Sequence, residues 1–305
     1  MSLSVLKWRV ARWAERCLPP GLLATIAWPV IAAIALRRAL GRHGRSWRDA
    51  VSGMADERPG IMATWRHLID ESYLMLATCW PDRWHEPGWA RRFHVTGLEE
   101  VEQLANAATP VVIAVVHFTN MAMLRYVLRS RGIPAASLAG FREHHPTAGV
   151  CDEALDRVAG LPGVPNRFVA ADLRSAYHFL RSGNCLIIAC DVETQQNVAV
   201  TTPVGTLHVA VGPFRLAQMA GGVVVPAILW QSGRLRFEAS FGEPIRPEPA
   251  RGMPEPFRPI AERCMRHWMP VMQAFPTQYD GGLGRVWRSE ATAAPRIVSP
   301  PKADT

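Results

Sequence analysis

The apolar run VVIAVV at positions 111–116 constrains the fold more than any other segment of the chain. It is rich in β-branched residues and carries no charge, which is typical of a strand buried on both faces of a sheet. The segments at 135–139 and 185–190 predict two further strands. Because strands of this kind need helices on both sides, they indicate an α/β fold with a central sheet.

The segments between these strands carry helical apolar spacing or hairpin turn residues. A hairpin is predicted around Ser232-Gly233, with strands at 223–230 and 234–241, so the sheet is expected to be mixed. Helices are predicted at residues 59–79, 97–107, 172–181, 213–220 and 257–273, together with one that ends at Arg131. The expected architecture is therefore a mixed central sheet flanked by helices.

The basic residues of the chain are concentrated at its N-terminus. Residues 1–48 contain nine Lys or Arg residues against the single acid Glu15, whereas the remainder is balanced in charge. Within this segment, residues 17–36 form an uncharged stretch interrupted by prolines, such as Pro29. Its length is at the lower limit for crossing a bilayer, so a spanning helix and an interfacial helix both remain open, as does a buried core helix with a basic face. We expect residues 1–48 to form a membrane-associated helical arm, residues 49–288 the folded domain and residues 289–305 a disordered tail.

The cysteine and histidine patterns give no support for a metal site. The six cysteines include no CxxC pair, which favours buried, reduced thiols. Cys185 and Cys190 bracket a predicted strand at a spacing that places them on opposite faces. The chain also lacks the glycine-rich motifs GxxxxGK[ST] and GxGxxG. Nucleotide hydrolysis and dinucleotide binding therefore lose their usual sequence support.

His117 is the residue with the clearest chemical potential. It follows the buried run at 111–116 directly, and a helix is predicted after it. Open α/β sheets bind their ligands at the carboxyl ends of their strands, where a histidine can act as a general base. The alternative is a histidine that only satisfies backbone groups at the end of the strand.

The segment VVIAVVHFTNMAM at 111–123 resembles the first block of the bacterial lipid A biosynthesis acyltransferases, in which a strand leads into His-Phe-Gly-Asn-Trp-Glu. Further similar segments follow in the family's order, and the resemblance covers roughly residues 5–290. They are Phe141-Arg142, the sequence from Arg181 through Asn184 to Asp191, residues 201–205, GPFRLAQMAGGVVVP at 212–226, and residues 275–279 before Trp287-Arg288.

This resemblance implies a glycerolipid acyltransferase-like fold and transfer of a fatty acyl group from an acyl carrier protein or coenzyme A thioester to a hydroxyl of a membrane glycolipid. In the family a histidine removes the proton from that hydroxyl, and no metal or redox cofactor is needed. The resemblance places the protein at the cytoplasmic face of a bacterial inner membrane, in lipopolysaccharide synthesis. Nucleic acid is not an expected partner, because the basic segment is interleaved with a long apolar run.

The chain departs from the family pattern beside its histidine. The family has Asp or Glu five positions after it, where this chain has Ala122; Asn120 matches the family, and Thr119 replaces a glycine. Three interpretations follow. A distant carboxylate orients His117, with Glu143, Asp191 and Glu193 as candidates; or His117 acts unassisted; or the chain is an inactive relative that binds lipid or acyl carrier protein.

Three arginines are further candidates for the site. Arg142, Arg167 and Arg215 fall in connections that are expected to face the ligand, where guanidinium groups could bind phosphates or carboxylates of the substrate. Because almost all the basic residues of the chain are arginines, a solvated surface role is the alternative for each of them.

Overall fold

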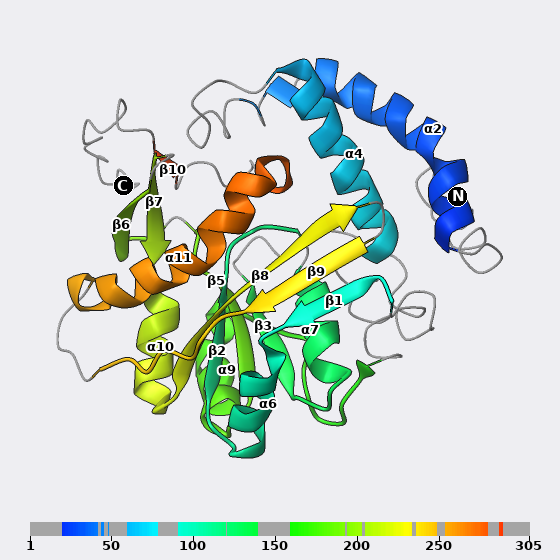
Figure 1. Cartoon of the computed structure of the whole chain (residues 1–305). Helices are drawn as coiled ribbons and strands as arrows, with labels where there is room; N and C mark the ends of the chain where they lie inside the picture. The colour runs from blue at the N-terminus through cyan, green and yellow to red at the C-terminus, as the bar shows by residue number, and fades with distance from the viewer. Residues whose placement is uncertain are drawn as a thin grey trace, which may run out of the picture.

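The computed structural model describes residues 20–41, 44–45, 48, 60–78, 91–119, 121–139, 159–192, 194–202, 205–233, 236–248, 254–279 and 287–288. Over these residues the chain forms an α/β structure with a mixed central sheet flanked by helices, as predicted (Figure 1). The expected tail at 289–305 lies outside the described residues.

Seven described strands form the central sheet, in the order β1-β9-β8-β2-β5-β3-β4. Their bounds are β1 (Phe93–Thr96), β2 (Val111–Val115), β3 (Ala135–Ala139), β4 (Arg167–Val169), β5 (Cys185–Ala189), β8 (Val223–Gly233) and β9 (Arg236–Phe241). A second, three-stranded sheet contains β6 (Asn197–Thr202), β7 (Gly205–Ala210) and β10 (Trp287–Arg288). β1, β4 and this second sheet were not predicted.

The described helices are α2 (Pro20–Leu40), α4 (Ile61–Thr78), α6 (Leu98–Asn106), α7 (Met121–Arg129), α9 (Leu173–Arg181), α10 (Gly212–Ala220) and α11 (Arg258–Ala274), with short 3-10 turns η2 (Ala170–Asp172), η3 (Glu255–Phe257) and η4 (Pro276–Gln278). The helices predicted after the N-terminal arm lie within a few residues of the observed ones. Helix ends fray, so differences of this size are expected.

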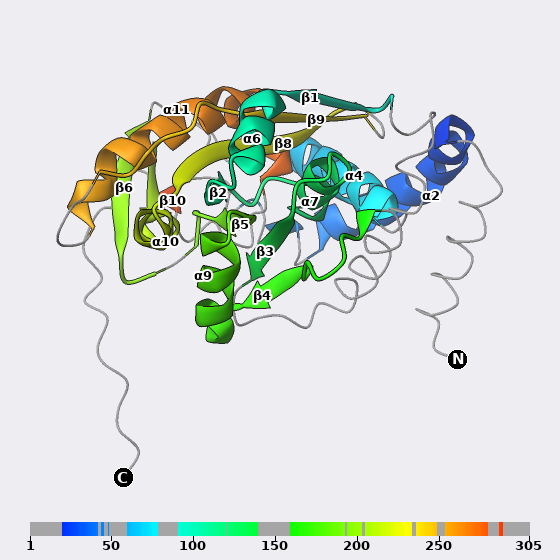
Figure 2. The ribbon, with the colours of Figure 1, turned by 90° about the horizontal axis from the view of Figure 1, so that it is seen from below.

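The two faces of the sheet are covered by different helices. In β2, Val112 and Ala114 belong to the apolar cluster that contains α9, α10 and α11, whereas Val111, Ile113 and Val115 pack with α6 and α7. This alternation is the period of two that a strand imposes on its side chains. Cys185 and Cys190 fall into opposite clusters, which confirms their predicted separation. Figure 2 shows the sheet between these layers.

The strand directions bring several chain ends to one edge of the sheet. β2 runs parallel to β5 and β8, so their carboxyl ends lie together. β8 continues beyond the end of β2, and β9 pairs with this continuation in the antiparallel direction. β9 and the parallel strand β1 therefore lie beyond the ends of β2 and β5, with Phe241 at the end of β9 opposite Ala227. We call this the carboxyl edge of the sheet. The opposite edge is tightly packed, because Gly183 has φ +83° and a Cβ there would lie 2.5 Å from the carbonyl oxygen of Ala108.

α2 packs on α4 through one face. Ala35, Ala39 and Leu68 form a small buried cluster between the two helices. The indole Nε1 of Trp65 donates a hydrogen bond to the carbonyl oxygen of Ala32 at 2.9 Å. α4 in turn contacts η4, which joins this helical pair to the sheet domain (Figure 1).

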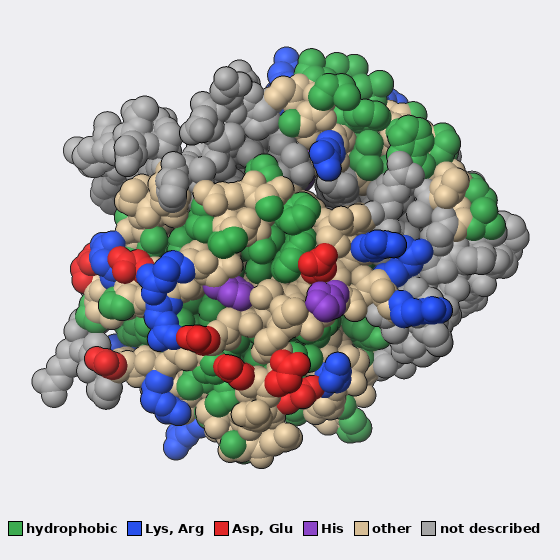
Figure 3. All heavy atoms as spheres, viewed as in Figure 1, with side chains coloured by type: hydrophobic (Ala, Val, Ile, Leu, Met, Phe, Trp, Pro, Cys, Tyr) green, Lys and Arg blue, Asp and Glu red, His purple; other side chains and the backbone are tan. Residues whose placement is uncertain are grey.

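The opposite face of α2 is apolar and exposed. Leu22, Ile26, Val30 and Ile34 recur at every fourth position, and their exposed fractions run from 49% at Leu22 to 61% at Val30. Figure 3 shows the hydrophobic surface that α2 presents at this corner of the molecule. No helix in the described part of the chain has the length and apolar content needed to cross a bilayer.

Candidate active site

His117 and Asp191 lie side by side at the carboxyl edge. β2 and β5 pair in parallel with Val115 opposite Ala189, so His117 and Asp191 each stand two positions beyond that pair. The ring Nδ1 of His117 lies 2.8 Å from Oδ1 of Asp191, and the backbone N–H of His117 donates to both carboxylate oxygens at 3.0 and 2.9 Å. The register of two core strands therefore positions this pair.

The surroundings of the pair set the chemical roles of its atoms. Asp191 is fully buried, whereas the His117 side chain is 26% exposed. A carboxylate can only accept a hydrogen bond, so Nδ1 of His117 carries the proton of this contact and Nε2 carries the lone pair. A buried carboxylate also stabilises the imidazolium that forms when Nε2 takes up a proton. The arrangement is that of a general base with its orienting acid.

The backbone turns sharply after His117. The N–H of Phe118 donates to the carbonyl oxygen of Val116 at 2.7 Å, and Thr119 has a positive φ of 64°. Such a φ is strained for a β-branched residue, and it is the conformation that glycine adopts freely. Glycine is also the residue at the matching position of the acyltransferases that the sequence resembles. Here the Thr119 hydroxyl donates to the carbonyl oxygen of Leu229 at 2.7 Å, which holds the turn against β8.

The segment at 275–279 braces the same turn from the other side. Tyr279 forms an antiparallel bridge with Phe118. The side-chain amide of Gln278 accepts a hydrogen bond from the backbone N–H of Gln231 at 2.7 Å and donates one to its carbonyl oxygen at 2.5 Å. The Gln278 amide thus satisfies the backbone groups of Gln231 in the way that a neighbouring strand would, where β8 extends beyond β2. Sequence reasoning noted this segment only for its resemblance to the acyltransferases and assigned it no structural role.

The structure describes only some of the other predicted site residues. Asn120, Glu143, Glu193 and Arg142 lie outside the described residues. Position 122 falls in the first turn of α7. Arg167 is in the edge strand β4, beside Ser137 of β3, and lines none of the described cavities.

A large apolar cavity adjoins the carboxyl edge, on the face of the sheet that α9 and α10 cover. Its volume is about 780 Å³, within the roughly 300–1,000 Å³ typical of small-molecule sites. Ile188, Val192 and Leu216 contribute to its apolar wall, so it reaches the residue next to Asp191. Arg215, one of the predicted arginines, lines it together with Arg174, which sequence reasoning missed because no motif contains it.

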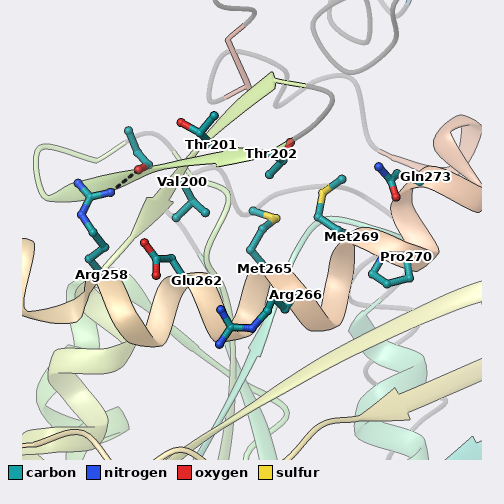
Figure 4. A pocket seen from close by; sticks show the side chains of 11 residues that line it. Val200, Thr201, Thr202, Arg258, Glu262, Met265, Arg266, Met269, Pro270 and Gln273 are labelled. Carbon is teal, nitrogen blue, oxygen red and sulfur yellow. Dashed lines mark hydrogen bonds between the residues drawn. The ribbon is translucent and has the colours of Figure 1, made fainter.

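A second cavity of about 560 Å³ lies between β6 and α11. Figure 4 shows Met265 and Met269 pointing from α11 into this cavity, with Arg258 and Glu262 at one end. Arg258 Nη1 donates to the carbonyl oxygen of Ala199 at 2.7 Å, so this arginine also ties α11 to the second sheet. Among the described residues that line this cavity, neither His117 nor Asp191 is present.

The three described cysteine thiols are buried and protonated, so their surroundings do not activate them for catalysis. Cys185, Cys190 and Cys264 are free and buried, as predicted for the cysteines of this chain. Burial raises the pKa of the Cys185 thiol to about 12 and raises those of Cys190 and Cys264 as well. Protonated thiols are poor nucleophiles and poor metal ligands. Over the described residues, no group of three or more His, Cys, Asp or Glu side chains is arranged to hold a metal ion.

Comparison with known proteins leaves the site to be interpreted from its own geometry. No model of a protein family matches the chain, and no curated protein sequence matches it.

Proposed function

We propose that the chain transfers a fatty acyl group from a carrier thioester to a hydroxyl of a membrane glycolipid, in the manner of the lipid A biosynthesis acyltransferases that its sequence resembles. The observation that carries this proposal is the 2.8 Å contact between His117 Nδ1 and Asp191 Oδ1 at the carboxyl edge of the sheet. Asp191 supplies the orienting acid that Ala122 cannot. The pair therefore favours the interpretation in which a distant carboxylate orients His117 over the one in which the chain is an inactive relative.

The proposed reaction follows from the roles of the two side chains. His117 Nε2 takes the proton of the acceptor hydroxyl as its oxygen attacks the thioester carbonyl. The tetrahedral intermediate then collapses, the carbon–sulfur bond breaks, and the leaving thiolate takes the proton back from the imidazolium. Asp191 keeps the imidazole in the tautomer with its lone pair on Nε2 and stabilises the positive charge between the two proton transfers.

The apolar cavity beside Asp191 supports a fatty acyl substrate. Its wall is largely aliphatic and includes Tyr177, which favours burial of a hydrocarbon chain. Arg174 and Arg215 bring two guanidinium groups to the same cavity. Acyl carrier protein and coenzyme A both present their thioester on a phosphorylated arm, and guanidinium groups bind phosphate through paired hydrogen bonds. The acyl chain of the proposed donor therefore fits the apolar wall of this cavity, and the phosphorylated arm fits its two arginines.

The exposed apolar face of α2 supports a membrane-bound acceptor. One face of α2 is occupied by α4, and the other presents Ile26, Val30 and Ile34 to the surroundings. Arg37 and Arg38 in its last turn are placed to attract anionic headgroups. We propose that α2 lies in the interface of the cytoplasmic leaflet of a bacterial inner membrane instead of spanning it.

The test is acyl transfer by the purified full chain in detergent micelles. Radiolabelled acyl–acyl carrier protein and acyl-coenzyme A are supplied separately, with a lipid A precursor as the acceptor. We expect transfer from at least one donor, and we expect His117→Ala to abolish it. His178→Ala is the matched control, because His178 is an exposed histidine on α9. Transfer that survives His117→Ala unchanged would refute the catalytic assignment, and tight lipid binding by a wild type without transfer would favour the inactive relative.

A further inference from the structure

The apolar cavity next to Asp191 is lined by two arginines whose charges are not balanced by any described side chain. Arg174 lies on α9 and Arg215 lies on α10, and both belong to the wall of this cavity of about 780 Å³. Neither guanidinium forms a hydrogen bond or an ion pair with another described residue. Among the described residues that line the cavity, none is acidic. Two positive charges therefore face a largely apolar space.

The positions of the two arginines in their helices make these charges unfavourable for the fold. Arg174 and Arg215 both lie in the first turn, where the helix dipole carries a partial positive charge. Neither first turn contains an acid. Asp172 precedes α9, but its side chain makes no capping hydrogen bond, and it is not among the residues that line the cavity. Helix stability therefore does not account for the two arginines, whereas a bound anion would be attracted by both.

The wall of the cavity suits a hydrocarbon chain. α9 and α10 pack against each other on one face of the sheet, and the Tyr177 hydroxyl donates to the carbonyl oxygen of Met219 at 3.3 Å. Ile188 and Leu216 contribute buried side chains to the wall. Leu173 and Met219 also line the cavity and are 49% and 57% exposed, so its rim is apolar where it meets solvent. A chain that enters over this rim stays in contact with apolar side chains.

We propose that this cavity binds a free single-chain anionic lipid, with its head group at Arg174 and Arg215 and its chain along the apolar wall. The head is either the carboxylate of a fatty acid or the phosphate of a lysophospholipid, since guanidinium groups bind both through paired hydrogen bonds. Burial of the chain supplies the other part of the affinity.

The inference goes beyond the proposed acyl transfer, because binding needs neither His117 nor a thioester. It rests on the proposed function in one respect only. If the acyl donor occupies the same cavity, a free lipid of this kind competes with the donor and slows the reaction.

The experiment is equilibrium dialysis of the full chain near neutral pH, with the same detergent on both sides of the membrane. The radiolabelled probes are dodecanoate, dodecyl phosphate, dodecanol and dodecylammonium, which share one chain length and differ in the head group. We expect at least one of the two anions to bind about tenfold more tightly than dodecanol, and dodecylammonium to bind more weakly than dodecanol. The anion that binds more tightly identifies the head group.

Single substitutions assign the binding to the two arginines. Arg174→Gln and Arg215→Gln should each weaken binding of the preferred anion about fivefold and leave dodecanol binding unchanged. Arg181→Gln is the matched control, because Arg181 is an exposed arginine at the other end of α9 and does not line the cavity.

A charge reversal provides a gain that misfolding cannot imitate. The double variant Arg174→Glu, Arg215→Glu should lose its preference for anions and bind dodecylammonium more tightly than dodecanol. The proposal would be overturned if neither anion bound more tightly than dodecanol. Equal weakening by Arg181→Gln and by the two cavity variants would also overturn it, as would anion binding that none of these variants changes.

An inhibition measurement separates this proposal from the proposed reaction. In the acyl transfer assay, the preferred anion should inhibit the wild type competitively with the donor. Anion binding that depends on the two arginines, in a chain without transfer, would support the lipid site and count against the proposed reaction. Transfer by a chain whose dialysis shows no such binding would overturn the lipid site and leave the proposed reaction standing.

Discussion

Asp191 accepts hydrogen bonds from both the ring and the backbone of His117, at 2.8 Å from Nδ1 and at 2.9 and 3.0 Å from the main-chain nitrogen. The carboxylate therefore fixes the position of the histidine as well as the orientation of its ring. A single fully buried acid performs both tasks.

Asp191→Asn should lower the rate of acyl transfer by a factor on the order of 10⁴, because an amide orients the imidazole poorly and carries no charge to stabilise the imidazolium. Asp191→Ala should in addition lower the free energy of unfolding by about 1–3 kcal/mol, since it leaves the His117 N–H without its acceptor. Single-turnover kinetics and urea unfolding measure the two effects. A rate for Asp191→Asn within tenfold of the wild type would contradict the assignment.

Ala122→Glu introduces an acid at the position where the acyltransferases that the sequence resembles have one, and it should change the transfer rate less than tenfold. The reason is that Nδ1 of His117 already donates to Asp191 and has no second proton for another carboxylate. The informative comparison is the same substitution in the Asp191→Asn background, measured in the same assay. A large gain in the wild-type background would show that Asp191 does not serve as the orienting acid.

Thr119 should respond differently to two substitutions. Thr119→Gly relieves the strain of the positive φ but loses the hydrogen bond to Leu229, so the free energy of unfolding should change by less than about 1 kcal/mol. Thr119→Val keeps the branched side chain in the strained conformation and also loses the bond, so it should cost about 1–2 kcal/mol. Urea unfolding ranks the two variants. Equal stability of the Val and Gly variants would mean that the positive φ of Thr119 imposes no strain on a branched side chain.

The buried thiols should resist modification. Burial raises the pKa of Cys185 to about 12 and raises those of Cys190 and Cys264, so all three stay protonated and enclosed near neutral pH. We expect the Cys17→Ser, Cys79→Ser, Cys151→Ser triple variant to show no reaction with a disulfide reagent until it is unfolded in guanidinium chloride. Rapid labelling of the native variant would disprove this burial.

His267 should make the fold less stable in mild acid. Burial lowers its pKa, and its Nε2 lies 3.1 Å from the carbonyl oxygen of Ser240. The unfolded chain then binds more protons than the folded one, so the free energy of unfolding falls as the pH drops below about 6.5. Urea unfolding across this range should show a smaller decrease for His267→Gln than for the wild type. Identical pH dependence would exclude His267 as the cause.

Local sequence patterns were sufficient to predict the core strands and helices, but they did not predict the short strands or the order of the strands in the sheet. The long apolar runs that became β2 and β5 were recognisable because both of their faces are buried. The strands β1 and β4 contain only four and three residues, and they are defined by their neighbours more than by their own composition.

The choice among the candidate acids depended on a property that no local pattern contains. The sequence offered Asp191, Glu143 and Glu193 as candidate acids, but it could not tell which strand lies next to β2. The structure places β5 there in a parallel register, and this register brings Asp191 to His117 across 74 positions of the chain. Strand order is decided by tertiary packing, so this part of the site was beyond prediction.

The brace formed by Gln278 and Tyr279 has a consequence for the synthesis of the protein. A ribosome completes β2 and β5 long before it reaches η4, and domains begin to fold while they emerge. A nascent chain that stops before η4 therefore contains His117 and Asp191 but lacks the amide contact to Gln231 and the bridge to Phe118. His117 acquires this support only when the last part of the domain has been translated, so incomplete chains contain His117 and Asp191 without the contacts that hold the turn after His117 in place.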